Sequence, residues 1–240
     1  MSVCCAFAKV HEVFDLMALR LDVLSGSEQL RWASFGSDKR RQVFFAGRML
    51  ARWVLARRLG LPAAEAPALS LEIDALGRSS FPAWPDLGLS ISHSGEGIAC
   101  AAASGAVGID IEDLSRPRDF LALAAQVHSS QQCLQLAAQA EDARAESFYR
   151  CWTLKEAWLK RQGLGLDLTR MRGLEIEAVD GPASAASLVL NSSQQRWILA
   201  LEGQELSEGA LDLCLLSPGM SGLSALSFRL IESAAAGAAD

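Results

Sequence analysis

Residues 87–112 have the sequence LGLSISHSGEGIACAAASGAVGIDIE, and this stretch decides the fold. Its apolar segments are four to eight residues long, and Gly- and Ser-rich turns separate them, which is typical of strands. We therefore expect three β-strands, over residues 87–91, 98–103 and 106–111. The short Ser104-Gly105 connection predicts that the last two strands form a hairpin.

On either side of this stretch, helical and strand patterns occur in the same order twice. Apolar periodicity predicts a first long helix over residues 38–59, which Gly60-Leu61-Pro62 ends. After Asp113, helices are expected over residues 120–127, 131–140 and 146–162. Further strands are expected over residues 69–73, 174–178, 185–190, 197–201, 211–216 and 223–231.

This repeated order predicts an α+β fold made of two similar halves that meet near Ser104–Val107. The first half covers residues 1–105 and the second covers residues 106–232. The Ala-rich end, residues 233–240, is predicted to be disordered.

Composition places the chain among ordinary globular proteins. It has 240 residues, of which 50% are hydrophobic and 21% are charged, which argues against wholesale disorder. Its six cysteines include no CxxC pair, so neither a disulfide framework nor a zinc site is expected, and the thiols are typical of a reduced compartment. No signal peptide or membrane-spanning run is evident. We therefore expect a cytoplasmic protein.

Charge is distributed unevenly along the chain. The formal net charge is −6, which argues against a general binder of nucleic acid or anionic membranes. Residues 31–60 nevertheless contain eight basic side chains and one acid, a local charge of +7, so the other residues sum to −13. The bland interpretation is a solvated helix face, but a face of one sign without interleaved acids favours an anionic partner.

Two carboxylates in Gly108-Ile109-Asp110-Ile111-Glu112 are candidates for a cation site. On a strand, Asp110 and Glu112 share one face and stand about 6–7 Å apart, while Ile109 and Ile111 face the core. Such a pair suits Mg²⁺ that is also bound by phosphates and waters. The alternative is a strand whose exposed face is simply acidic.

A second candidate lies in the helix expected over residues 146–162. Trp152, Glu156 and Lys160 form one i, i+4, i+8 row. Alone, a Glu–Lys pair at this spacing is usually a minor surface ion pair. It adds a third carboxylate and a cation to the first site if the helix lies beside the strand.

A third candidate is Ser90-Ile91-Ser92-His93-Ser94-Gly95. Hydroxyl and imidazole donors at a strand end, followed by glycine, can surround a phosphate. The alternative is a histidine that only caps a turn. The chain contains no GxSxG elbow, P-loop or Rossmann glycine motif that would indicate another kind of site.

Taken together, the motifs resemble the 4′-phosphopantetheinyl transferase superfamily of the Sfp type. The resemblance extends over about residues 35–170. It is carried by Gly77-Arg78 with Phe81-Pro82, Ser92-His93-Ser94-Gly95, Gly108-Ile109-Asp110-Ile111-Glu112, Trp152-Thr153-Leu154-Lys155-Glu156-Ala157 with Leu159-Lys160, and Gly163-Leu164-Gly165-Leu166.

The resemblance implies a pseudo-dimer of two α+β halves with coenzyme A in the cleft between them. It implies a Mg²⁺-dependent reaction, for which Mn²⁺ can substitute. Phosphopantetheine passes from coenzyme A to a serine hydroxyl of an apo carrier protein, and adenosine 3′,5′-bisphosphate is released. The carriers would belong to fatty-acid, polyketide, nonribosomal-peptide or siderophore synthesis. The resemblance also implies a monomer.

The resemblance assigns roles to individual residues. Asp110, Glu112 and Glu156 would hold the metal, and Glu156 would also be the base. Lys160 would stabilise the phosphoryl charge and contact the cofactor. The other residues expected to bind coenzyme A are Lys39, Arg40, Arg78, Ser79, Ser92, His93 and Asp110. Arg78 and Ser79 stand where the family usually has a Lys-Pro pair.

Three other functions compete with this interpretation. A degenerate relative could bind coenzyme A or a carrier without catalysis, although the intact Asp110, Glu112, Glu156 and Lys160 count against this. A Mg²⁺-dependent pyrophosphohydrolase could use the same carboxylates, but no glutamate-rich helix supports it. Nucleic-acid binding through residues 31–60 lacks a known motif.

Overall fold

The computed structural model of the protein describes residues 3–16, 21–75, 77–180, 183–192, 195–204, 206, 211–217, 221–222 and 226–232. The tail expected to be disordered, residues 233–240, lies outside these described residues, and so do the first residues of the strand expected over 223–231. Within the described ranges, no helix is long and apolar enough to cross a membrane. All six cysteines are free thiols.

The chain forms both helices and strands, which confirms the expected α+β class. The helices are α1 (Val10–Leu16), α2 (Gly26–Ala33), α3 (Asp38–Arg58), α4 (Phe120–Val127), α5 (Ser130–Ala137), α6 (Glu141–Arg161) and α7 (Leu168–Gly173), with 3₁₀ turns at Leu21–Val23 and Ala63–Ala68. The strands are β1 (Val3–Lys9), β2 (Glu72–Ile73), β3 (Ser79–Ser80), β4 (Leu87–Ser94), β5 (Gly97–Ser104), β6 (Val107–Asp113), β7 (Leu174–Ala178), β8 (Ala185–Asn191), β9 (Arg196–Gly203), β10 (Leu211–Leu215), β11 (Ser221–Gly222) and β12 (Leu226–Glu232).

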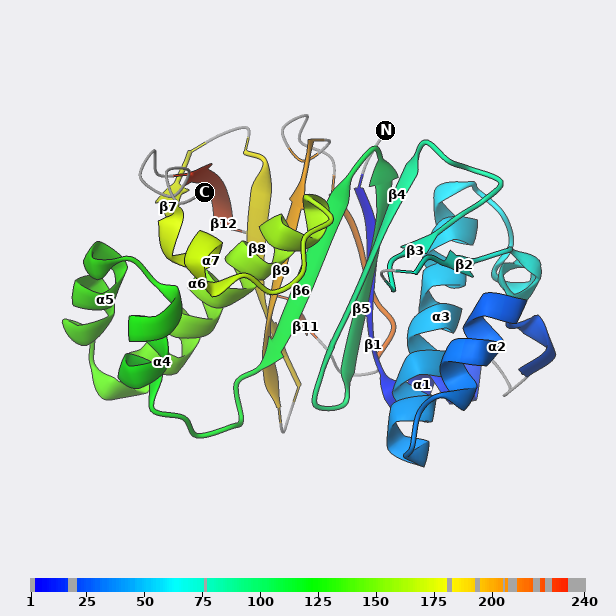
Figure 1. The fold of residues 1–240 in the computed structure, drawn as a ribbon, viewed down its shortest axis with the longest axis horizontal. Coiled ribbons are helices and arrows are strands. Elements are labelled where there is room, and N and C mark those ends of the chain that lie inside the picture. Colours follow the sequence, from blue (N-terminus) through cyan, green and yellow to red (C-terminus); the bar gives the residue numbers. More distant parts are fainter. Residues whose placement is uncertain are drawn as a thin grey trace.

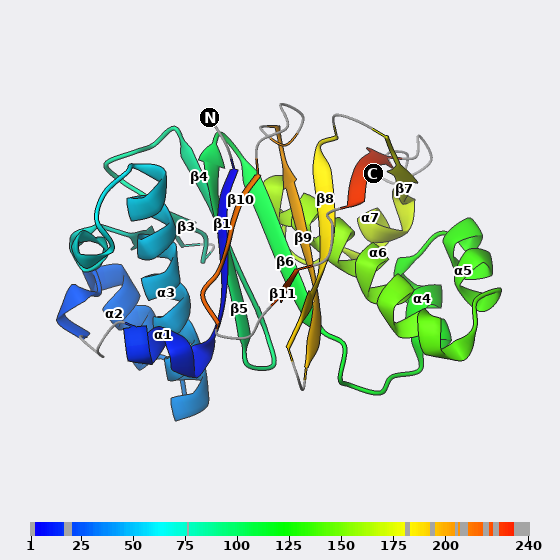
Figure 2. The same ribbon diagram turned by 180° about the vertical axis from the view of Figure 1, so that it is seen from behind.

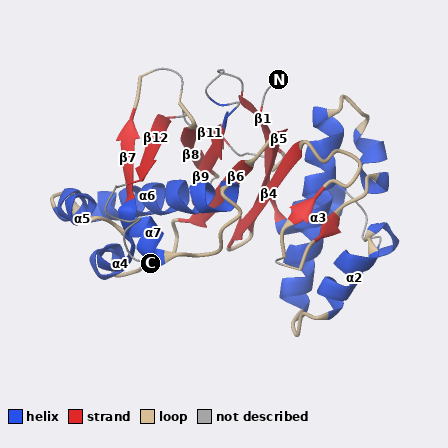
Figure 3. Cartoon of the chain, turned by 45° about the horizontal axis from the view of Figure 1, so that its top comes forward, coloured by secondary structure: helices blue, strands red, loops and turns tan. Residues whose placement is uncertain are grey.

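The strands form two main sheets that lie between outer helices. The first sheet has the order β10-β1-β5-β4, and the second has the order β6-β9-β8-β12-β7, with β11 beside β8. Helix α3 covers the outer side of the first sheet, and α6 covers the outer side of the second (Figures 1 and 2). The strands therefore occupy the middle of the molecule, with helices on both flanks (Figure 3).

Alternation of side chains along the strands explains this layering. On β1, Cys4, Ala6 and Ala8 pack in the core beneath α3, whereas Val3, Cys5 and Phe7 pack against the second sheet. Successive side chains of a strand point to opposite faces, so one strand contributes to two cores. A further core, between the second sheet and helices α4 to α7, completes the layers.

The hairpin expected between the last two strands of residues 87–112 is wrong. β5 pairs with β4 through the turn at residues 94–97, and with β1 on its other side. Both edges of β5 are thus occupied, so β6 passes to the second sheet and pairs with β9. Gly105, with φ of 75°, lies at this change of direction.

One strand of the first sheet comes from the C-terminal part of the chain. This strand, β10, pairs in parallel with β1. β1 itself was not expected from the sequence. Its segment Val3–Lys9 is buried on both faces and therefore lacks the polar alternation that marks a half-exposed strand.

Candidate functional site

The edge strands β4 and β6 belong to different sheets, and serine hydroxyls connect them. Ser90 Oγ accepts a hydrogen bond from a backbone amide of β6. Ser92 Oγ donates to Asp110 Oδ1 at 2.7 Å, and Ser94 Oγ donates to Glu112 Oε2 at 2.7 Å. Because alternate residues of a strand share a face, β4 presents all three serines to β6. The serines thereby fix both carboxylates of the Gly108–Glu112 motif.

Helix α6 lies directly on β6, and Gly108 makes this possible. A Cβ atom at Gly108 would lie 1.8 Å from the carbonyl oxygen of Ala157, so no other residue fits without moving the helix. The close approach brings Lys160 over the strand. Its Nζ donates to Asp110 Oδ1 at 2.7 Å, to Ser92 Oγ at 2.9 Å and to a β6 carbonyl at 3.1 Å.

The three candidate carboxylates interact with one another electrostatically. Burial and the charges of Asp110 and Glu112 together raise the pKa of Glu156 to about 7, against the opposing effect of Lys160. Burial also raises the pKa of Glu112, whereas the hydrogen bond from Ser94 lowers it. A carboxyl group that titrates near neutral pH can accept a proton from a substrate hydroxyl. Asp110 and Glu112 of the strand thus lie close enough to Glu156 and Lys160 of the helix for their charges to interact, as expected.

The carboxylates fit a cation in their chemistry, although they do not form a closed cage. Within the described residues, no group of three or more His, Cys, Asp or Glu side chains is close enough to enclose a metal ion. Asp110 Oδ2, however, is buried and has no hydrogen-bond partner. Such an acceptor normally has one, and carboxylate oxygens are the ligands that Mg²⁺ prefers. Asp110 is therefore suited to an open cation site that ligands other than these side chains would complete.

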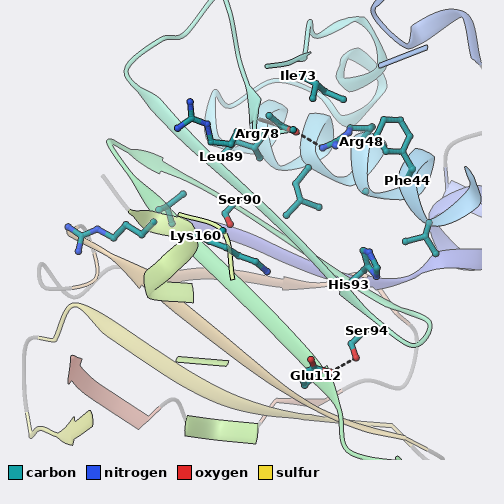
Figure 4. A pocket seen from close by; sticks show the side chains of 18 of the residues that line it. Phe44, Arg48, Ile73, Arg78, Leu89, Ser90, His93, Ser94, Glu112 and Lys160 are labelled. Carbon is teal, nitrogen blue, oxygen red and sulfur yellow. Dashed lines mark hydrogen bonds between the residues drawn. The ribbon is translucent and has the colours of Figure 1, made fainter. Parts of the chain in front are cut away.

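A basic cavity of about 1550 Å³ opens beside this group (Figure 4). Elements of both sheets and both long helices line it. Among its described lining residues, nine basic side chains outnumber the acids Asp74 and Glu112. The basic residues are Arg31, Lys39, Arg40, Arg48, Arg78, Arg116, Arg118, Lys160 and Arg161. This charge balance suits a ligand with several negative charges.

The structure separates the basic residues of segment 31–60 into two groups. Arg31, Lys39, Arg40 and Arg48 line the cavity. The remaining four basic residues of the segment have partners outside the cavity. Arg52 is buried in an ion pair with Glu28, Arg57 pairs with Asp212, Arg41 pairs with Asp38, and Arg58 donates to Ser104. The cavity thus accounts for half of the eight basic residues in this segment.

Most of the other residues expected to bind a cofactor also line the cavity. Arg78 pairs with Asp74 at 2.7 Å, and its guanidinium reaches toward Gly163 after α6. Ser79 accepts a hydrogen bond from Arg48. The His93 side chain lies in the cavity, and its partial desolvation there, together with the charge of Lys160, lowers its pKa.

Three expected residues lie outside the lining. Asp110 and Ser92 are buried behind Lys160, which does line the cavity, and Glu156 is half-buried. They are linked to the cavity through Lys160 and through their electrostatic coupling to Glu112.

Several lining residues were not singled out from the sequence. Arg31 and Arg48 were counted only as part of the basic segment. Tyr149 is another of them, and burial and the charge of Glu112 raise the pKa of its hydroxyl, whereas Arg118 opposes the shift. The available signal for Tyr149 was its place one helical turn before Trp152, which also lines the cavity.

Comparisons with known proteins all match one family. The family model of the 4′-phosphopantetheinyl transferase superfamily matches residues 106–214. A 4′-phosphopantetheinyl transferase of Bacillus subtilis is 36% identical over 122 residues, which is 51% of this chain and 52% of that protein. The transferase Sfp of Bacillus subtilis strain 168 is 31% identical over 157 residues, covering 60% of this chain and 68% of Sfp.

A third relative comes from another organism. The transferase AcpT of Salmonella typhi is 36% identical over 115 residues, which is 47% of this chain and 59% of AcpT. The matched region thus spans about half to two thirds of these three relatives. The chain belongs to the 4′-phosphopantetheinyl transferase superfamily, as its motifs predicted.

Proposed function

We propose that this protein transfers 4′-phosphopantetheine from coenzyme A to a serine hydroxyl of an apo carrier protein and releases adenosine 3′,5′-bisphosphate. One observation carries the proposal: a cavity with nine basic side chains borders Glu112 and Lys160, which are coupled to Asp110 and Glu156. Coenzyme A carries a diphosphate and a 3′-phosphate, so it needs this charge balance. Three of the relatives named above are transferases of this kind.

Coenzyme A binds through the cavity's basic wall. Lys39, Arg40, Arg78 and His93 hold its phosphates, and we add Arg31 and Arg48 to this set because they line the same cavity. Ser79 acts on the ligand through Arg48, to which it is hydrogen-bonded. Ser92 acts through Lys160 and Asp110 in the same way. Guanidinium groups suit this task because they contact phosphate oxygens in bidentate fashion.

Asp110, Glu112 and Glu156 are the residues that would hold Mg²⁺, with Mn²⁺ as a substitute. An ion held there would supply charge neutralisation on the diphosphate. Ser92 and Ser94 orient two of these carboxylates before any ligand arrives. Asp110 Oδ2 has no hydrogen-bond partner, so it is the oxygen best suited to bind the ion.

Glu156 and Lys160 have different roles in the transfer step. The serine oxygen of the carrier forms a bond to the phosphorus that bears pantetheine, and the bond from that phosphorus to adenosine bisphosphate breaks. Glu156, with a pKa near neutral, accepts the serine proton at its carboxylate. Lys160 donates hydrogen bonds through Nζ and stabilises the negative charge that develops on the phosphoryl oxygens and leaving group.

The same proposal covers the arrangement of the chain. Residues 1–105 and 106–232 form two halves of a pseudo-dimer. Each half has a 21-residue helix, α3 or α6, that packs against a sheet. Strand β10 of the second half joins the sheet of the first half. The cavity is the cleft between the halves. The partners are acyl and peptidyl carrier proteins in the cytoplasm, and the protein acts as a monomer.

Incubation with coenzyme A, Mg²⁺ and an apo carrier protein, followed by intact-mass measurement, tests the function. Addition of the phosphopantetheine mass to the carrier supports the proposal. Release of adenosine bisphosphate without that addition would identify a hydrolase instead. Binding of coenzyme A with no product would identify a binding module, and a second incubation without divalent cation tests the metal requirement.

A further inference from the structure

Four residues on the cavity wall form a row in which two neighbouring aromatic rings lie between two guanidinium groups. The Arg31 guanidinium lies 5.1 Å from the centre of the Phe35 ring, and the Arg48 guanidinium lies 4.5 Å from the centre of the Phe44 ring. The two rings are 5.4 Å apart with planes tilted by 52°. All four residues line the cavity. We call Arg31, Phe35, Phe44 and Arg48 the ladder.

The ladder connects two helices that contribute to one wall. Arg31 belongs to α2, and Phe44 and Arg48 belong to α3, with Phe35 in the segment between them. Figure 4 shows the Arg48 side chain beside the Phe44 ring. A guanidinium group within about 6 Å of a ring is attracted to the ring's face. Each arginine therefore has its own aromatic support.

Arg48 is held more firmly than Arg31. Its terminal nitrogen donates to Ser79 Oγ at 2.6 Å, while its Nε is buried and has no partner. Burial lowers the Arg48 pKa to about 10, so the group remains charged at neutral pH. A charged donor that is shielded from water and incompletely paired carries a free-energy cost, and binding of an anionic acceptor removes that cost.

We propose that Phe35 and Phe44 are positioning residues that hold Arg31 and Arg48 in place for the phosphate groups of coenzyme A before it binds, an inference that rests on the proposed function. A free arginine side chain loses rotamer freedom when it grips a ligand, and this loss weakens binding. The rings remove most of that cost because they order the guanidinium groups in the empty protein.

The first test uses the protein without ligand. Nitrogen-15 relaxation of arginine Nε–Hε groups reports side-chain order on the picosecond to nanosecond timescale. We expect Arg31 and Arg48 to be ordered in the wild-type chain, F35L to loosen Arg31 and F44L to loosen Arg48. Replacement of Phe44 by tyrosine should keep Arg48 ordered because it retains the ring. Unchanged order in F35L and F44L would overturn the proposal.

The second test measures coenzyme A affinity by calorimetry and turnover by transfer to an apo carrier. F35L and F44L should each weaken binding by about three- to tenfold, the range expected for ordering one long side chain, while kcat stays near the wild-type value. In an R48Q background, F44L should cost no further affinity, since the residue that the ring positions is gone. A further loss in that background would show a general packing effect and overturn the proposal for Phe44.

A matched control is available on the same helix. Trp53 supports Arg57 at 5.8 Å, and Arg57 pairs with Asp212 away from the cavity. W53L removes an aromatic support of the same kind and should leave coenzyme A affinity unchanged. Failure of the wild-type chain to bind coenzyme A would overturn the proposed function, whereas the ligand-free relaxation measurement decides the ladder separately.

Discussion

Lys160 Nζ lies 2.7 Å from Asp110 Oδ1, and this contact links helix α6 to strand β6 at the border of the basic cavity. The same carboxylate oxygen also accepts a hydrogen bond from Ser92 of β4. One oxygen atom therefore collects donors from a helix and from the neighbouring sheet, while the second oxygen of Asp110 has none. The arrangement fixes the carboxylate and leaves one of its oxygens for the cation that we propose.

Replacement of Lys160 by methionine should lower kcat much more than it weakens coenzyme A binding. The substitution keeps the apolar stem but removes the Nζ donor, and loss of one such donor typically slows catalysis about 100- to 1000-fold. An arginine at the same position should not restore the rate, because the contacts to Asp110, Ser92 and a backbone carbonyl suit a compact ammonium group. Steady-state kinetics with an apo carrier would measure both parameters.

Lys9 offers a control for that experiment. It lies over the ring of Trp197 and is not among the residues that line the cavity. K9M should therefore leave kcat and the affinity for coenzyme A unchanged. An equal loss of activity in K9M and K160M would contradict the role given to Lys160.

Substitution of the carboxylates should abolish transfer without unfolding the protein. E156Q removes the proposed base, and D110A removes the buried acceptor with the unpartnered oxygen. Both changes also remove mutual repulsion, because the charge of Asp110 contributes to the raised pKa of Glu156. We expect loss of product by intact mass together with a melting temperature close to that of the wild type. Near-wild-type transfer by either variant would refute the assignment.

Local periodicity predicted much of the site. Strand alternation placed Asp110 and Glu112 on one face, and helical spacing placed Glu156 and Lys160 in one row, and both patterns depend only on near neighbours in the chain. Helix α3 also begins at Asp38 as expected, since Ser37 caps it by accepting a hydrogen bond from Arg40 N.

What the sequence could not predict depends on distant partners. Arg48 and Arg52 are one turn apart on α3, yet Arg48 faces the cavity while Arg52 is buried against Glu28, 24 residues earlier in the chain. No local pattern distinguishes the two arginines. The wrong hairpin has the same origin, because the pairing of β5 depends on β1 at the other end of that half.

Gly108 should tolerate no side chain, since α6 lies against its backbone. The Cβ of G108A would meet the Ala157 carbonyl oxygen at 1.8 Å and the Arg161 nitrogen at 2.9 Å, so the helix must move. Overpacking of this kind costs about 1–3 kcal/mol of unfolding free energy. It should also separate Lys160 from Asp110 and reduce transfer. Urea denaturation and the carrier assay would measure the two effects.

Gly203 provides the matched control for this substitution. It lies on β9 opposite Val107, and a Cβ there would meet Val107 at 3.5 Å, an ordinary contact. G203A should change stability and transfer far less than G108A. If the two variants lost stability equally, the close approach at Gly108 would not be the cause.

Stability should fall below pH 6.5 because of His128, which is buried among α4 to α6. Burial and, to a smaller extent, the nearby Lys155 charge lower its pKa to about 4. In the unfolded chain, histidine titrates near 6.5, so between these values the unfolded state binds more protons than the folded state, and stability rises with pH. For one such group, acidification from pH 7.5 to 5.5 costs about 1 kcal/mol of unfolding free energy.

Comparison with H128N isolates this contribution from the carboxylates, whose raised pKa values act in the opposite direction. Urea denaturation of both proteins at pH 7.5 and 5.5 gives the wild-type minus variant difference at each pH. Because asparagine does not titrate, that difference should shrink by about 1 kcal/mol on acidification. A difference that stays constant would mean that His128 is protonated equally in the folded and unfolded states, and its burial beside Lys155 would then carry no penalty.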